Sequence, residues 1–298
     1  MSTLPSYPCY LNGEFSTLAE AKISVLDRGF IFGDGVYEVA PVYHGKAFRF
    51  DHHMARLDRS LAELRIANPL THVQWRELVQ ALVARFAQSA GSDPLTSDYL
   101  IYIQVTRGVA MRDHPMLPGL TPTVFVMCSP MKLPSAEQRQ TGVVCVTADD
   151  FRWQKAHIKS VSLLGAVFSR QISVDAGALE TVMFRGDYLS EAAASNVWVV
   201  KDGQVVGPPR DNLVLEGIRY GLLAELCQAQ GIGFALRPVH RSEVLAADEL
   251  LLTSATKEVL AITTLDGQPV GHANHCGAPG PVYAKLYAAY QQAKQDAA

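Results

Sequence analysis

The feature that limits the fold most is a pair of strand-forming runs in the second half of the chain, residues 180–184 and 188–200. The polar turn Arg185-Gly186-Asp187 separates the two runs, and Lys201-Asp202-Gly203 follows the second. Two such runs around a short polar turn predict an antiparallel hairpin. Residues 10–15 repeat the pattern around an Asn-Gly turn, so antiparallel pairing is expected in both halves of the chain.

Helix-forming segments lie between these strands. Asp51 is the expected N-cap of a helix that carries Met54, Leu57, Leu61 and Leu64 on one face. Further helices are expected at residues 75–86, at 163–176, at a segment ending with Gln228, and at 282–294. Further strands are expected at residues 99–108, 123–127, 142–147 and 250–258.

The chain is long enough for two domains. Its 298 residues are 48% hydrophobic and 18% charged, which provides apolar surface for more than one sizeable core. Residues 129–135 are rich in Pro and Ser, the composition of a linker. We therefore expect an N-terminal domain of residues 1–130, a linker of residues 131–135 and a C-terminal domain of residues 136–298.

Charge and cysteine content narrow the partners and the compartment. The formal net charge of -3, without a long Lys/Arg run, gives no reason to expect nucleic acid or an acidic membrane surface as a partner. The five cysteines are scattered and form no Cys-x-x-Cys pair, so neither a metal site nor a redox dithiol is expected. Without a secretory signal or a membrane-length apolar run, we expect a cytoplasmic protein that acts on small molecules.

Lys159 is the best candidate for a reactive residue. It lies between a strand-like run and an apolar, helix-competent segment, and its apolar neighbours are Ile158, Val161 and Leu163. Exclusion of water lowers the pKa of an amine, and a deprotonated amine attacks carbonyl groups. Taken alone, such a lysine is more often a surface residue that extends its charge into water.

The N-terminal half holds further candidates for ligand binding. Three glycines within residues 29–35 bring the backbone close to another group, and either a tight loop or a ligand-binding loop explains them. The two-residue period of the following strand puts Tyr37 and Val39 on one face, as for a pocket-lining pair. Arg56 lies beside the apolar stripe of its helix, where most arginines are solvated or packed.

Other candidates are spread along the rest of the chain. Arg112 and His114 share a loop and can converge on one carboxylate, although two exposed polar residues are the plain alternative. Glu191 lies at the end of a strand and can pair with a cationic ring, although a surface glutamate is commoner. The free N–H groups of the helix that follows residues 211–220 suit a phosphate, and the turn near residues 253–258 is a second possible anion site.

In order along the chain, these segments match the motifs of one known family. The motifs are Asp27-Arg28-Gly29 with Phe32-Gly33-Asp34-Gly35-Val36-Tyr37-Glu38-Val39; His53-Met54-Ala55-Arg56-Leu57; Gln104-Val105-Thr106-Arg107-Gly108; Ile158-Lys159-Ser160; Glu191 with Ser195-Asn196-Val197; Gly217-Ile218; and Thr253-Ser254-Ala255-Thr256-Lys257-Glu258-Val259. Each is weak alone. The ordered set, between Tyr10 and Tyr287, resembles the fold-type IV pyridoxal-phosphate aminotransferases, which include D-amino-acid and branched-chain aminotransferases and aminodeoxychorismate lyases.

The resemblance implies a role for each candidate. Lys159 would hold pyridoxal 5'-phosphate as an internal aldimine and then move a proton between the substrate Cα and the cofactor C4′. Glu191 would pair with the pyridinium nitrogen and keep the ring an electron sink. The other implied cofactor contacts are Arg56, Thr256 and the backbone amides of Ile218 and Arg219 at the phosphate, Leu215 at the ring, and Ser195, Asn196, Gly217 and Ala255 within the matched motifs.

Within the family, Arg112-Asp113-His114 resembles the carboxylate trap of the D-amino-acid aminotransferases. In that trap Tyr37, with Val39 on the same face, and an Arg/His pair from the partner subunit of a homodimer grip the substrate α-carboxylate. Its orientation decides which enantiomer presents its Cα hydrogen to Lys159. The implied reaction transfers the amino group of D-alanine or D-glutamate to a 2-oxo acid.

The implied fold is α+β, with a smaller N-terminal α/β domain, a larger C-terminal β-rich domain with helices, and the cofactor in the cleft between them. The alternatives are a branched-chain L-amino-acid aminotransferase, an aminodeoxychorismate lyase with the same cofactor, and a non-enzymatic relative. Three departures from the family pattern bear on the choice. Ala192-Ala193-Ala194-Ser195 replaces a serine-rich loop, Arg219-Tyr220 replaces Thr-Arg, and His157 replaces an acidic residue.

Overall fold

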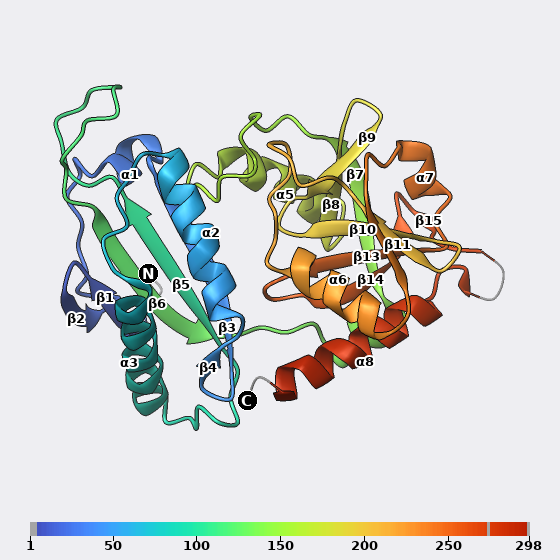
Figure 1. Ribbon diagram of the computed structural model, residues 1–298, viewed down its shortest axis with the longest axis horizontal. Helices are drawn as coiled ribbons and strands as arrows, with labels where there is room; N and C mark the ends of the chain where they lie inside the picture. Colours follow the sequence, from blue (N-terminus) through green and yellow to red (C-terminus); the bar gives the residue numbers. More distant parts are fainter. Residues whose placement is uncertain (1–4, 273–274, 297–298) are drawn as a thin grey trace. The chain divides into compact units, whose positions relative to one another are not determined.

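The computed structural model describes residues 5–272 and 275–296 (Figure 1). Within this range the chain divides into two compact units. Unit 1 comprises the residues up to Met131 together with Ile158–Leu163 and Asp296, and unit 2 comprises Lys132–His157 and Leu164–Gln295. Both units contain helices and strands, which confirms the α+β class. The domain limits expected from the sequence remain a prediction.

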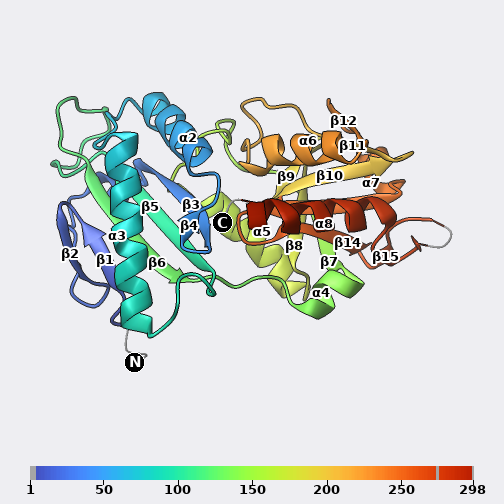
Figure 2. The same cartoon turned by 60° about the horizontal axis from the view of Figure 1, so that its bottom comes forward.

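Unit 1 is built on a six-stranded antiparallel sheet in the order β2-β1-β6-β5-β3-β4. Helices α2 and α3 pack on one face of this sheet (Figures 1 and 2). The elements are β1 (Pro8–Leu11), β2 (Glu14–Thr17), α1 (Arg28–Phe32), β3 (Gly35–Tyr43), β4 (Lys46–Ala47), α2 (Phe50–Glu63), α3 (His72–Ala90), β5 (Tyr99–Thr106) and β6 (Thr123–Pro130).

The two faces of strand β3 differ in their surroundings. Val36 and Glu38 are fully buried on the face that α2 covers, whereas Tyr37 and Val39 are half-buried on the opposite face. The alternation expected for Tyr37 and Val39 is therefore confirmed. On their face, Tyr37 lies opposite Gln104 of β5.

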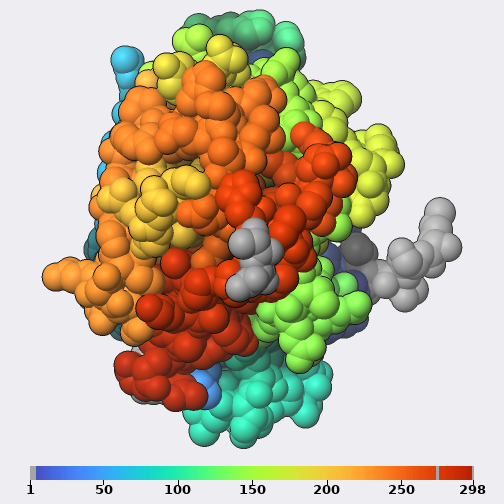
Figure 3. All heavy atoms as spheres, turned by 90° about the vertical axis from the view of Figure 1, so that its right-hand side faces the viewer, coloured from blue at the N-terminus to red at the C-terminus, as the bar shows by residue number. Residues whose placement is uncertain are grey.

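Unit 2 contains a nine-stranded mixed sheet. Its path is β12-β11-β10-β13-β14-β7-β8-β9, with β15 added beside β14. The elements are α4 (Ala136–Thr141), β7 (Val143–Asp149), α5 (Leu164–Asp175), β8 (Glu180–Arg185), β9 (Tyr188–Ala192), β10 (Asn196–Lys201), β11 (Gln204–Gly207), α6 (Arg219–Ala229), β12 (Gly233–Leu236), α7 (Arg241–Leu245), β13 (Glu249–Ser254), β14 (Glu258–Leu265), β15 (Gln268–Pro269) and α8 (Pro281–Asp296). Figure 3 shows one face of the molecule, whose surface comes largely from the orange and red residues of this unit.

The predicted hairpin is confirmed only in its first part. Strands β8 and β9 pair antiparallel around residues 185–188. The single returning strand expected at 188–200 is wrong, because the Ala192 amide donates to the Ser195 carbonyl at 2.7 Å and turns the chain. Strand β10 then pairs with β11 and β13 instead. This break sets Glu191 just before a turn.

The expected N-cap of α2 is also wrong. The helix begins at Phe50 after Arg49, which has a left-handed φ of 55° and makes no side-chain cap. Phe50 is buried in the core of unit 1, and because of this packing the helix begins two residues earlier than expected. Asp51 lies in the first turn, where its charge still suits the helix dipole.

Three further observations concern membranes, metals and thiols. No helix in residues 5–272 and 275–296 combines the length and apolar character needed to cross a membrane. Over the same residues, no cluster of three or more His, Cys, Asp or Glu is arranged to hold a metal ion. The cysteines are free thiols, buried except for Cys276.

Candidate active site

The candidate residues are divided between the two units, and Lys159 belongs to unit 1. Its segment lies beside the start of β3, where the Tyr37 amide donates to the Lys159 carbonyl at 2.9 Å. The Lys159 amide donates to Ser60 Oγ at 3.3 Å, and the Val161 amide donates to the Gly35 carbonyl at 3.0 Å. These bonds hold the backbone of Lys159 without using its side chain.

The glycine-rich loop makes this close approach possible. Gly33 ends α1 with a φ of 66°, and a Cβ placed there would lie 2.5 Å from Ser162 Oγ. Ser162 Oγ in turn donates to the Gly33 carbonyl at 2.9 Å. The group that the glycines were expected to approach therefore includes the Lys159 segment itself.

The side chain of Lys159 lies over an aromatic ring. Its Nζ is 4.0 Å from the ring centre of Tyr37, a cation–π distance. Tyr37 stacks on Tyr102 with ring centres 5.8 Å apart, and the Tyr102 hydroxyl donates to Gln104 at 2.7 Å. Burial and the neighbouring Tyr37 raise the pKa of Tyr102 to about 12, so this hydroxyl stays a donor at neutral pH. The structure thus brings Lys159 and Tyr37 together, and Tyr102 supports the Tyr37 ring.

Arg56 is held by a buried carboxylate, Glu38, which lies in a matched motif but had no expected role. Arg56 Nε and Nη2 donate to the two oxygens of Glu38 at 2.7 and 2.8 Å, and His53 Nδ1 lies 2.8 Å from Glu38 Oε2. Burial alone would raise the pKa of Glu38, but Arg56 and His53 lower it to about 2. The signal for Glu38 was its position between Tyr37 and Val39, which turns it toward α2. The phosphate role of Arg56 stays a prediction.

Arg112 and His114 are exposed but share one neighbour. The Arg112 guanidinium lies 5.5 Å from the ring centre of Phe32, and the His114 ring centre lies 5.5 Å from the same ring. Arg28 also faces Phe32, at 4.8 Å. The two residues of the expected carboxylate trap therefore gather around one aromatic platform.

Arg28 fixes the backbone of this loop, a role that its place in the motif Asp27-Arg28-Gly29 did not predict. It is 3% exposed, and its guanidinium donates to the carbonyls of Asp113 at 2.5 Å and His114 at 3.3 Å. Arg28 Nε also donates to Asp34 at 2.8 Å, and Arg107 binds the same carboxylate at 2.7 and 3.0 Å. Burial would raise the pKa of Asp34, but Arg107 and Arg28 hold it below its usual value. The loop that carries Arg112 and His114 is thus anchored to a buried ion cluster.

In unit 2, three predicted residues gather around the carboxylate of Glu191. Asn196 Nδ2 donates to Glu191 Oε2 at 3.2 Å and to the Leu215 carbonyl at 2.9 Å, and the Leu215 amide donates to Glu191 Oε1 at 3.3 Å. A Cβ on Gly217 would lie 2.1 Å from Asn196 Oδ1, so only glycine leaves Asn196 in place. The structure therefore brings Glu191, Asn196, Leu215 and Gly217 together.

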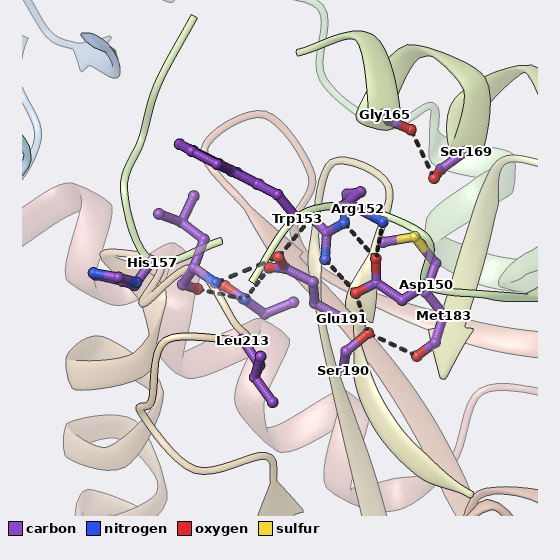
Figure 4. A network of polar contacts seen from close by, with 12 residues as sticks. Asp150, Arg152, Trp153, His157, Gly165, Ser169, Met183, Ser190, Glu191 and Leu213 are labelled. Carbon is purple, nitrogen blue, oxygen red and sulfur yellow. Dashed lines mark hydrogen bonds and ion pairs between the residues drawn. The ribbon is translucent and has the colours of Figure 1, made fainter. Parts of the chain in front are cut away.

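Arg152 contacts Glu191 from the other side and was not predicted. Its Nη1 donates to Glu191 Oε1 at 2.8 Å, while its Nε and Nη2 donate to Asp150 at 2.9 and 2.8 Å (Figure 4). Burial raises the pKa of Glu191 above its usual value, and Arg152 opposes the rise. The available signal was the charged run Asp149-Asp150-Phe151-Arg152 after a predicted strand.

The two predicted anion-binding segments also lie side by side. Arg219, buried at the start of α6, donates through Nη2 to the Ala255 carbonyl at 3.4 Å. The Lys257 amide donates to Ser254 Oγ at 3.1 Å and closes the turn that carries Ala255 and Thr256. Helix α6 begins without a side-chain cap. Its first amides and this turn form one region suited to an anion.

Ser195 lies in the same unit, beside that turn rather than beside Glu191. Its hydroxyl donates to Glu180 Oε1 at 3.0 Å, and Lys257 Nζ donates to the same oxygen at 2.8 Å. Glu180 is fully buried. Ser195 is therefore linked to the 254–257 turn through a buried carboxylate.

Comparison with known proteins identifies the family. The family model described as amino-transferase class IV matches residues 35–265. The D-alanine aminotransferase of Bacillus licheniformis is 37% identical over 280 residues, which covers 94% of this chain and 94% of that protein.

Solved structures agree on the fold. A branched-chain amino acid aminotransferase of T.th., solved with pyridoxamine 5'-phosphate, matches with a TM-score of 0.88 at 22% identity, over 99% of this chain and 96% of its own. A fold IV-transaminase from Curtobacterium pusillum matches with a TM-score of 0.79 at 24% identity, over 92% of each chain. At these identities the matches establish the fold, which is fold-type IV as the motifs implied. The chain therefore belongs to the class IV aminotransferases.

Proposed function

We propose that this chain is a pyridoxal-phosphate-dependent aminotransferase that transfers the amino group of D-amino acids, of the D-alanine and D-glutamate type, to a 2-oxo acid. The observation that carries the proposal is the 37% identity, over 94% of the chain, with a D-alanine aminotransferase. The side-chain arrangement supports it, because Lys159 lies against Tyr37 while Arg112 and His114 gather around Phe32.

The residues of unit 2 fit a phosphorylated pyridine ring. Burial raises the pKa of Glu191, and a cation at its carboxylate would offset that cost, as a protonated ring nitrogen does. The uncapped start of α6, with the amides of Ile218 and Arg219, lies beside the turn that carries Ala255 and Thr256. Backbone donors at a helix start are suited to a phosphate. Glu191 therefore suits the ring nitrogen of the cofactor, and the backbone amides suit its phosphate.

Lys159 is the acid–base residue in this proposal. Pyridoxal phosphate supplies an electron sink for the electron pair released when the substrate Cα–H bond breaks. Lys159 Nζ would hold the cofactor and would take the proton from the substrate Cα. The Tyr37 ring restricts the movement of this amine, since it lies 4.0 Å from Nζ.

The remaining residues bind and orient. Glu191 would hold the ring nitrogen, and Leu215, whose backbone is fixed by Glu191 and Asn196, would contact the ring. The phosphate contacts that we assign are Arg56, Thr256 and the amides of Ile218 and Arg219, with Ser195, Gly217 and Ala255 shaping the surrounding backbone. Tyr37, Val39, Arg112 and His114 bind the substrate.

We further propose a homodimer in which Arg112 and His114 serve the partner's site. Apolar side chains near this loop are strongly exposed, with Met111 at 76% and Met116 at 50%. Helix α5 exposes Leu164 and Phe168 in unit 2. Exposed apolar groups of this kind are typical of subunit interfaces. We also propose a cytoplasmic location, because the five cysteines are free thiols.

Replacing Arg112 with Leu tests the substrate assignment. We expect KM for D-alanine to rise roughly 10- to 100-fold, because a charged hydrogen-bond partner of the carboxylate is lost. Cofactor affinity, measured by titrating the apoenzyme with pyridoxal phosphate, should not change. Arg85→Leu is the matched control, since Arg85 also lies over an aromatic ring, that of Phe15 at 4.2 Å, and should leave KM unaltered. Loss of cofactor binding in Arg112→Leu would refute the assignment.

Dependence on an amino acceptor tests the reaction class. Purified holoenzyme with D-alanine and 2-oxoglutarate should form pyruvate and D-glutamate in equal amounts. Without 2-oxoglutarate, pyruvate should not exceed the amount of enzyme, because the amino group has no second acceptor. Continuous release of pyruvate from an enolpyruvyl ether substrate such as aminodeoxychorismate, with no acceptor present, would establish the lyase instead.

A further inference from the structure

A buried aspartate behind Glu191 has no role in the function proposed so far. Asp150 follows β7, and its carboxylate is fully shielded from solvent. It accepts five hydrogen bonds, from the amide, Nε and Nη2 of Arg152, from Arg185 Nε at 3.1 Å and from Ser190 Oγ at 2.9 Å. Such a satisfied carboxylate is rigid. The Asp150 carboxylate therefore also fixes the positions of the side chains that donate to it.

The group that Asp150 fixes is the Arg152 guanidinium. Two of its nitrogens, Nε and Nη2, form a fork on Asp150, so the plane of the guanidinium is set. The third nitrogen, Nη1, then points to Glu191 Oε1 at 2.8 Å. Figure 4 shows Arg152 between the two carboxylates. The Arg152 guanidinium therefore joins the carboxylates of Asp150 and Glu191.

We propose that Arg152, oriented by Asp150, is a positioning residue that keeps Glu191 ionised and therefore keeps the proton on the pyridine nitrogen of the bound cofactor. The inference rests on the proposed function, because Glu191 must face that nitrogen. Without the guanidinium, the proton moves from the ring nitrogen to a Glu191 oxygen, and both groups become neutral. The electron sink then weakens while substrate binding is retained.

The electrostatics around Glu191 support this assignment. Burial raises the pKa of Glu191, and the charge and hydrogen bond of Arg152 are the largest opposing effects. Asp150 acts in the raising direction, but Arg152 and Arg185 both bind it. Tyr220 of α6 also faces this region, and burial together with the Glu191 charge raises the pKa of its phenol. Among these groups Arg152 is the cation in direct contact with Glu191.

The test compares Arg152→Met with Arg185→Met. Arg185 is the matched control, since its guanidinium binds Asp150 Oδ2 and the Trp153 carbonyl rather than Glu191. Each holoenzyme is reconstituted with pyridoxal phosphate labelled with ¹⁵N in the ring, and the ring-nitrogen NMR signal is followed against pH. We expect wild type and Arg185→Met to show the protonated nitrogen at neutral pH. Arg152→Met should show the unprotonated nitrogen there.

Kinetics give a second readout. In Arg152→Met we expect kcat to fall while KM for D-alanine changes little, and Arg152→Lys should restore part of kcat because it returns a cation. The acid limb of the kcat profile should move up by about 1–3 pH units, the effect of losing an adjacent opposite charge. If Arg152→Met does not fold, the double variant Asp150→Asn/Arg152→Met, which removes both charges, carries the same expectations.

The outcomes separate this inference from the proposed function. A protonated ring nitrogen in Arg152→Met, with the kcat profile of Arg185→Met, would overturn the role of Arg152 while leaving the aminotransferase intact. Failure of the wild-type protein to bind pyridoxal phosphate or to turn over D-alanine would instead overturn the proposed function.

Discussion

Replacing Lys159 with Ala is expected to abolish transamination, with kcat reduced on the order of 10⁴-fold or more, the upper range for a proton-transfer group. The amine both binds the cofactor and moves the Cα proton, so no other group takes over its work. The fold should persist, because the hydrogen bonds that join Lys159 to Tyr37 and Ser60 come from its backbone. Turnover of D-alanine and hydrogen exchange of β3 measure the two effects.

Two comparisons test whether the loss of activity comes from the loss of the Lys159 amine. Lys159→Arg keeps a cation over the Tyr37 ring but stays protonated, so it should be as inactive as Lys159→Ala. Borohydride treatment of wild-type holoenzyme should attach the cofactor to the peptide that contains Lys159, as seen by mass spectrometry, and should attach nothing there in Lys159→Ala. Undiminished turnover in Lys159→Ala would falsify the assignment.

The second large effect concerns the stability of unit 1. Replacing Glu38 with Gln should lower the free energy of unfolding by ~3–5 kcal/mol, because Arg56 and His53 are left buried without their shared carboxylate. Hydrogen exchange of α2 and β3 amides measures the loss where it occurs. Glu243→Gln is the control, since it breaks an Arg–Glu pair of similar geometry that is exposed, and it should cost less than about 1 kcal/mol.

The same carboxylate predicts a pH dependence. The pKa of Glu38 falls from 4.5 in the unfolded chain to about 2 in the folded one, despite the opposing effect of burial. A depressed folded pKa stabilises the protein above pH 4.5, and the stabilisation, about 3 kcal/mol, is lost as the pH falls from there toward 2. The stability difference between wild type and Glu38→Gln should therefore shrink between pH 5 and pH 3. A constant difference would contradict this explanation.

Local patterns predicted much of the fold. The alternation at Tyr37 and Val39, the apolar stripe of α2 and the turn at Arg185-Gly186-Asp187 each depend on neighbouring residues, and each is found in the structure. The break after Ala192 was not visible, because strand-forming residues continue on both sides of it. The strand expected at 250–258 divides in the structure, where β13 ends at Ser254 and Glu258 begins β14. In the fold Glu258 is buried against Arg139 and Lys294.

The charged supports of the candidate site were missed for a different reason. Glu38 and Arg56 are 18 residues apart, and Arg152 and Glu191 are 39 residues apart. No period along the chain predicts such contacts, since they depend on how separate strands and helices pack. The matched motifs pointed to Lys159, Glu191 and Arg56 as site residues. They contain Arg28 without giving it a role, and Asp150 lies outside them, so the supporting roles of both follow only from their partners in space.

The most direct test of the central claim is a comparison of enantiomers. Purified holoenzyme with 2-oxoglutarate is given D-alanine in one reaction and L-leucine in another, and the keto acid product is followed in both. We predict pyruvate from D-alanine and no keto acid from L-leucine. Turnover of L-leucine without turnover of D-alanine would contradict the proposed function and place the chain with the branched-chain aminotransferases.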